Sequence, residues 1–286
     1  MDKKYLRRGS ISPIIIIGLI VVLLIGGYIL GQTKKQKTVR TDTPQGETTQ
    51  SQSQTQSRAK TSLYRFNGQN WQGQVAKNQP CYDNAPLSSS LSPDLAKATA
   101  KLYPGQERGG DYKAHGGLSF DNITNNVTIT LPATATLYEG SRYLEMGEEQ
   151  ILIDLQTDCG WLMRFDHLAK VGPDLASSIA ALPAPLPDQS QTHPISPLRL
   201  EAGTVIATEV GFKELKRTTV DFGLYDLKKP NAVSQTAAWQ AAHPELKQLG
   251  AHGVCWFDYL VAADQAIVKA LPAGDSNAGA QSDYCH

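Results

Sequence analysis

The sequence predicts a mainly β protein with an N-terminal transmembrane helix and a small helical C-terminal extension. Three features support this fold class. Residues 11–31 are apolar, short alternating or apolar segments follow between residues 117 and 227, and helical patterns return after residue 236. The formal net charge of the 286 residues is zero, so charge gives no reason to expect a nucleic-acid partner.

Residues 11–31 are predicted to cross the lipid bilayer. Only Ser12 is clearly polar in this stretch, and no charge interrupts it. About 20 helical residues at ~1.5 Å each span ~30 Å, the thickness of the hydrocarbon core. Basic residues flank both ends, so they do not orient the span. All four cysteines follow it, which fits disulfides in an oxidising compartment and predicts a single-pass protein of the cell membrane with a cytoplasmic N-terminus.

Two other interpretations of the N-terminus are open. One is a cleaved signal peptide, although the apolar run is long for one and Gln32-Thr33-Lys34-Lys35 holds no small-x-small cleavage site. The other is a pilin-like N-terminus, because Gly9 precedes the run, but no acidic residue lies near the start of the run.

Composition and pattern divide the chain into six parts. A polar, Gln- and Thr-rich segment after the span cannot bury enough apolar surface to offset its ordering entropy, which predicts a disordered tether. The expected parts are a cytoplasmic N-terminus (1–10), a transmembrane helix (11–31), the tether (32–62), an N-terminal flank (63–107), a β-domain (108–228) and a helical, disulfide-stapled extension (229–286).

Local patterns predict the secondary structure of the folded part. In the flank, Ser92 as a cap and Pro93 in a first turn favour a short helix over residues 92–102. Residues 183–197 contain five prolines and are expected to form a loop. Strands are expected at residues 126–131, 133–138, 150–155, 161–165, 205–210 and 218–227.

The C-terminal extension is expected to hold two helices and a disulfide. Residues 236–249 look helical with a bend at Pro244, and residues 263–271 form a short amphipathic pattern. Because Cys285 lies one residue before the chain end, we pair it with Cys255, and Cys81 with Cys159 by remainder. Four cysteines allow three pairings, and free buried thiols are the alternative.

Four segments of residues 108–228 share an order and spacing. They are His115-Gly116-Gly117-Leu118-Ser119, Phe165-Asp166-His167-Leu168, residues 200–207, and Asp221-Phe222-Gly223-Leu224-Tyr225. In this order they resemble the lysostaphin/LytM-type zinc peptidases, which act on peptidoglycan cross-bridges. The resemblance implies an antiparallel β-sandwich of the duplicated-hybrid-motif type.

The same resemblance implies that most of the metal site has been lost. The family's three zinc ligands correspond to His115, Ser119 and Gly223, and only the first can still bind zinc. The two histidines that assist catalysis in the family correspond to His167, which is kept, and Asp221, which is changed. Without a metal to activate water, the hydrolytic nucleophile is missing, so we expect no zinc cofactor and no catalysis.

The prediction from the sequence is a membrane-anchored, extracytoplasmic relative of the wall peptidases that binds peptidoglycan or regulates a cell-wall enzyme. A groove would make the contact, lined by His115, Ser119, His167, Asp221 and Tyr225. One alternative is an active zinc endopeptidase in which Asp121 and Asp221 supply displaced carboxylate ligands. The other is a structural envelope module whose β-domain only packs against partners.

Overall fold

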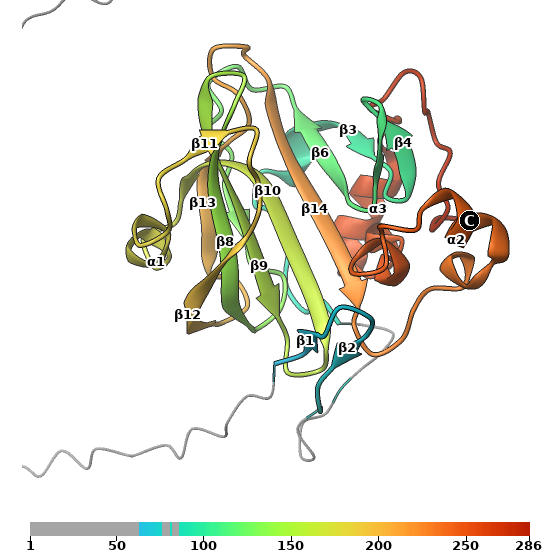
Figure 1. Ribbon diagram of the computed structural model, residues 1–286. Helices are drawn as coiled ribbons and strands as arrows, with labels where there is room; N and C mark the ends of the chain where they lie inside the picture. Colours follow the sequence, from blue (N-terminus) through green and yellow to red (C-terminus); the bar gives the residue numbers. More distant parts are fainter. Residues whose placement is uncertain (1–62, 76–80, 82–85) are drawn as a thin grey trace, which may run out of the picture. The chain divides into compact units, whose positions relative to one another are not determined.

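The computed structural model describes residues 63–75, 81 and 86–286 (Figure 1). The predicted cytoplasmic N-terminus, membrane span and tether lie outside these residues. In the described part of the chain, no helix has the length and apolar character that a membrane crossing needs. Contacts group these described residues into one compact unit.

The main sheet has ten strands. It forms the centre of the folded part in Figure 1. The order β11-β8-β9-β10-β14-β6-β3 runs across it, β12 pairs with β8, and β13 pairs with both β10 and β7. All pairs are antiparallel except β11 with β8, which confirms the mainly β prediction. The strands are β3 (Ala98–Leu102), β6 (Gly116–Phe120), β7 (Ile129–Thr130), β8 (Ala135–Glu145), β9 (Glu148–Gln156), β10 (Trp161–Val171), β11 (Leu186–Pro187), β12 (His193–Leu200), β13 (Val205–Val210) and β14 (Thr218–Asp226).

The remaining elements are short. Two hairpins stand apart from the main sheet, β1 (Arg65–Phe66) with β2 (Trp71–Gln72) and β4 (Gln106–Arg108) with β5 (Asp111–Lys113). The α-helices are α1 (Ala176–Ala180), α2 (Ala237–Ala242) and α3 (Ala262–Ala270). The 3₁₀ turns are η1 (Leu95–Lys97), η2 (Val233–Gln235), η3 (Gly250–His252) and η4 (Trp256–Asp258).

The alternation of side chains places the main apolar core on one face of the sheet, and the other face carries polar residues beside a smaller apolar cluster. On β14, Val220, Phe222 and Leu224 belong to the main apolar core. Asp221 and Gly223 therefore point to the opposite face, because successive strand residues alternate. The same holds on β10, where Met163 and Phe165 lie in the core and Arg164 and Asp166 face away from it. The polar face is where the candidate site forms.

The C-terminal extension is part of the same folded unit as the sheet. Trp256 of η4 is fully buried and packs edge-on against Phe222 of β14. Lys101 of β3 is only 4% exposed, and its ammonium donates to the carbonyls of Val268 and Lys269 at the C-terminal end of α3. A cation there satisfies carbonyls that the helix leaves without partners.

Both predicted disulfides are confirmed. Cys81 is bonded to Cys159, and Cys255 to Cys285. The alternative of free buried thiols is wrong, since no described cysteine is free.

Three expectations about local structure need correction. Residues 92–102 form η1 and then β3 rather than one helix, because an exposed edge of the sheet, β6, is available for pairing. Residues 183–197 contain β11 and most of β12 rather than only loop. Proline is tolerated there because both strands pair only with β8, and β12 shifts register between Pro194 and Leu198. The helix expected over residues 236–249 ends at Ala242, before Pro244.

Candidate functional site

A cavity of about 650 Å³ lies on the polar face of the sheet. His115, His167 and Asp221 are among the residues that line it. Strands β8, β10 and β14 and the β4–β5 hairpin also contribute side chains. The cavity falls within the volume range of roughly 300–1,000 Å³ that small-ligand sites occupy in proteins.

Asp221 is the centre of this cavity. It is paired in register with Gly117 of β6 on one side and with Asp166 of β10 on the other. Its Oδ2 atom lies 2.9 Å from Nε2 of His115 and 3.7 Å from Nε2 of His167. Two histidines that are 52 positions apart in the sequence therefore meet at one carboxylate.

The surroundings of Asp221 favour its ionised form. Burial alone raises the pKa of this carboxyl, but the charge and hydrogen bond of His115, and then the charges of His167 and Arg108, outweigh burial. The resulting pKa lies well below its usual range. The side chain is 13% exposed, so the carboxylate still reaches the cavity.

Gly117 leaves the room that this carboxylate needs. A Cβ atom at this position would lie 2.5 Å from the carbonyl oxygen of Val220 and 2.7 Å from Oδ1 of Asp221. Both distances are shorter than a non-bonded contact allows. The second glycine after His115 is thus required by the close approach of β14 rather than by a turn.

A β-bulge aims His167 at the cavity. The pairing of β10 with β9 shifts register between Phe165 and Leu168, and His167 has a φ of +58°. For a residue other than glycine this backbone conformation is strained, and such strain concentrates at functional sites. Its Nδ1 atom is buried and has no hydrogen-bond partner among the described residues, and it lies 3.8 Å from Oε2 of Glu145.

Asp166 holds the bulge in place. Its Oδ1 atom accepts hydrogen bonds from the backbone N–H of His167 and from the hydroxyl of Tyr143, both at 2.7 Å. Burial, and then the charge of Asp166, raise the pKa of Tyr143, so the phenol stays protonated as a donor. The orientation of His167 therefore depends on its own neighbour and on β8.

Two of the three arginines that line the cavity are held by different partners. Arg164 forms a two-pronged ion pair with the buried carboxylate of Asp154, at 2.8 and 2.7 Å. Arg108 instead donates to the carbonyl oxygens of Tyr103 and His115. Its guanidinium fixes the backbone of His115 and adds positive charge near Asp221.

Three of the five predicted groove residues line this cavity, and two do not. Ser119 lies further along β6 and is paired with Thr219, which lines the cavity, but Ser119 itself is not among the lining residues. Tyr225 is buried in a second apolar cluster with Tyr138, Leu162 and Leu227. Tyr225 reaches the site indirectly, because its ring occupies the space above Gly223.

The residues that are present do not fit the zinc site that the resemblance implies. Ser119 lies outside the cavity, and a Cβ on Gly223 would lie 2.5 Å from the Tyr225 hydroxyl. Asp221 and His115 are in direct hydrogen-bond contact, which leaves no space between them for an ion. Across residues 63–75, 81 and 86–286, no three His, Cys, Asp or Glu side chains are placed to hold a metal.

The sequence prediction missed most of the other lining residues, among them Arg108, Tyr143, Glu145, Arg164 and Asp166. A signal was available for Arg164, because it and Asp166 are the alternate polar residues of an otherwise apolar strand. Nothing local marks Tyr143 or Glu145, since β8 extends well past the predicted end at residue 138.

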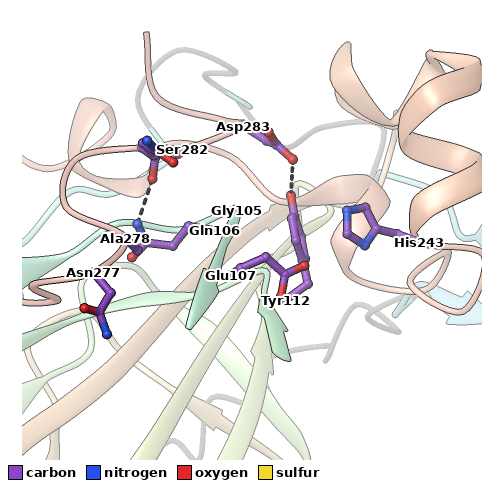
Figure 2. Close-up of a pocket in the computed structure, with 10 residues that line it drawn as sticks. Gly105, Gln106, Glu107, Tyr112, His243, Asn277, Ala278, Ser282 and Asp283 are labelled. Atoms are coloured by element: carbon purple, nitrogen blue, oxygen red, sulfur yellow. Dashed lines mark hydrogen bonds between the residues drawn. The ribbon is translucent and has the colours of Figure 1, made fainter. Parts of the chain in front are cut away.

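A second cavity, of about 430 Å³, lies between the β4–β5 hairpin and the C-terminal tail (Figure 2). Tyr112 donates to Oδ2 of Asp283 at 2.8 Å, and its ring lies 4.2 Å from that of His243. Burial raises the pKa of Tyr112 above its ordinary value. These groups bind one another, which indicates that they hold the tail against the hairpin.

Comparison with protein-family models, with curated proteins and with solved structures gives no match for this chain. The likeness to lysostaphin/LytM-type peptidases therefore rests on the residues named above.

Proposed function

We propose that this chain is a membrane-anchored, extracytoplasmic and non-catalytic relative of the wall peptidases, and that its central cavity binds the peptide part of peptidoglycan. Its sheet would be the duplicated-hybrid-motif sandwich, and residues 11–31 would hold it at the membrane with the N-terminus in the cytoplasm. If the chain regulates a cell-wall enzyme, that enzyme would bind at the same cavity.

The observation that carries this proposal is the closed cluster of His115, Asp221 and His167. An ionised carboxylate held by a histidine at 2.9 Å is a recognition group, because it presents a fixed charge to a ligand. Arg108 and Glu145 add one charge of each sign on the lining. A short peptide carries amines, carboxylates and amides that can pair with both signs.

A specific observation also favours the second candidate, an active zinc endopeptidase with a rearranged site. His115, His167 and Asp221 are donor types that zinc accepts, and they converge. A shift of the His115 ring away from Asp221 would be needed before all three could bind one ion.

The test uses the full chain in detergent micelles. We expect a synthetic, sugar-free peptidoglycan stem peptide to bind, and His115→Ala and Asp221→Asn to weaken that binding at least tenfold. His193→Ala is the matched control, because His193 is an exposed histidine on β12 that does not line the cavity. Bound zinc is measured on the same samples, together with release of peptide from purified sacculi.

Each outcome selects one function. Stoichiometric zinc that is lost in His115→Ala, with cleavage of sacculi, would replace the proposal by the zinc endopeptidase. A folded chain that binds neither stem peptide nor sacculi would favour the structural envelope module.

A further inference from the structure

A third cavity, of about 570 Å³, lies at the end of the sheet where β14 leaves it. The turn between β1 and β2 forms one wall, and the segment from η2 to η3 forms the other. Its lining includes Gln69, Asn70, Trp71, Gln235, Gln240 and Lys247. None of these residues takes part in the central cavity.

Trp71 provides a fixed aromatic wall. Its indole Nε1 donates to the carbonyl oxygen of Gln248 at 2.6 Å, although the two residues are 177 positions apart. Its ring also packs on Phe66, with 5.6 Å between the centroids. Because the indole is held at both its edge and its face, it loses little conformational entropy when a ligand packs on it.

Side-chain amides surround this wall. Gln69, Asn70, Gln235 and Gln240 are all exposed. Asn67 Oδ1 satisfies the backbone N–H groups of Gln69 and Asn70, and the side-chain amides of these two make no hydrogen bond to other described residues. The amides of Gln235 and Gln240 each donate one hydrogen bond to Ser234, at 3.2 and 3.0 Å, and keep a second donor and the acceptor oxygen. Amide donors and acceptors pair well with hydroxyl groups.

The charges of the lining residues limit which ligands the cavity can accept. No Asp or Glu lies among the residues that line the cavity, whereas Lys228 and Lys247 do. Lys228 is bound to Asp226 at 2.9 Å, and Lys247 is exposed at the rim. The cavity therefore accepts a neutral ligand or one with an acidic substituent, and it disfavours a cation.

We propose that this cavity binds an oligosaccharide. The C–H face of a pyranose ring packs on the indole of Trp71, the ring hydroxyls bind the amides of Asn70 and Gln235, and Lys247 pairs with an acidic substituent. This site goes beyond the proposed function, because it takes a sugar at one end of the sheet and leaves the central cavity to the peptide.

The experiment measures binding of chitotetraose, a neutral probe, and of tetragalacturonic acid, an acidic one. The full chain is kept in a detergent without a sugar headgroup, and calorimetry is combined with tryptophan fluorescence. We expect Asn70→Ala with Gln235→Ala to weaken binding of at least one probe tenfold or more. Lys247→Ala should weaken binding of the acidic probe alone.

Two controls separate this site from the general surface and from the central cavity. Gln191→Ala removes an exposed amide that does not line this cavity, and Asp221→Asn alters the central cavity; both variants should bind the sugars as the unaltered chain does. The proposal is overturned if neither probe binds at about 10 mM, a concentration that detects even millimolar affinity. It is also overturned if the amide variants keep their fold and full affinity.

Discussion

The hydroxyl of Tyr225 covers Gly223, two residues earlier on the same face of β14. A Cβ atom on Gly223 would lie 2.5 Å from this oxygen and 2.6 Å from Cε2 of the ring. Tyr225 is only 1% exposed, so its ring cannot swing into solvent. The strand position at Gly223, which the proposed relationship would align with a metal-binding histidine, therefore has no space for a side chain while Tyr225 is in place.

This contact predicts strong coupling between the two positions. Gly223→Ala should lower the free energy of unfolding by about 2 kcal/mol, because overpacking of a buried site typically has this effect. In a protein that already carries Tyr225→Leu, Gly223→Ala should lower the free energy of unfolding much less, because the clashing ring atoms are absent. Chemical denaturation of the four proteins in the cycle gives the coupling energy. If Gly223→Ala lowers the free energy of unfolding equally with and without Tyr225→Leu, the predicted coupling between the two positions is wrong.

Asp221 should make stability depend on acid pH. Its folded pKa lies below the unfolded value of about 3.9, so its contribution is complete above that value and is lost as the pH falls toward the folded pKa. Asp221→Asn should therefore destabilise the chain by about 2 kcal/mol near pH 5. The difference in the free energy of unfolding between the unaltered chain and Asp221→Asn should become smaller below pH 4.

Denaturant unfolding across the acid range checks this expectation. Asp174→Asn is the matched control, because Asp174 is exposed and forms no ion pair within the described residues. If the difference in the free energy of unfolding between Asp221→Asn and the unaltered chain stays constant as the pH falls, the ion pair with His115 does not stabilise the fold.

The sequence predicted the strands whose side chains alternate regularly. It also predicted that Asp221 and His115 belong to one site. Residues 205–210 form β13 as expected, and residues 218–227 form β14 to within one residue. Because β14 is buried between β6 and β10, its alternation fixed which residues face the cavity. That is why Asp221 and His115 could be placed in one site from the resemblance alone.

The parts that the sequence did not predict depend on long-range pairing. Residues 98–102 carry Ala, Thr and Leu in a pattern that suits a helix, yet β6 offers an edge and the segment pairs with it. The bulge at His167 is equally invisible, since it depends on hydrogen bonds from β8 and on a register shift against β9. Tyr225 was placed in the groove because alternation gives the face of a residue but not what covers it.

The disulfide between Cys255 and Cys285 should stabilise the extension substantially. It closes a loop with a sequence separation of 30. The loss of chain entropy in the unfolded state then predicts a contribution of roughly 3–4 kcal/mol. Cys255→Ala with Cys285→Ala should lower the free energy of unfolding by about this amount. Dithiothreitol should lower the stability of the unaltered chain at least as much, because it opens both disulfides; no loss in either experiment would contradict the expectation.

His167 should be a position where glycine is better tolerated than alanine. Its φ of +58° lies in the left-handed region, which disfavours any side chain by about 1 kcal/mol or more relative to glycine. His167→Gly and His167→Ala remove the imidazole equally, so the glycine variant should be the more stable by about this amount. His193 on β12 has ordinary strand geometry, and there glycine should be the less stable by roughly 0.5–1 kcal/mol. Denaturant unfolding of the four variants compares the two pairs, and the same sign at both positions would rule out the strained bulge as the way His167 reaches the cavity.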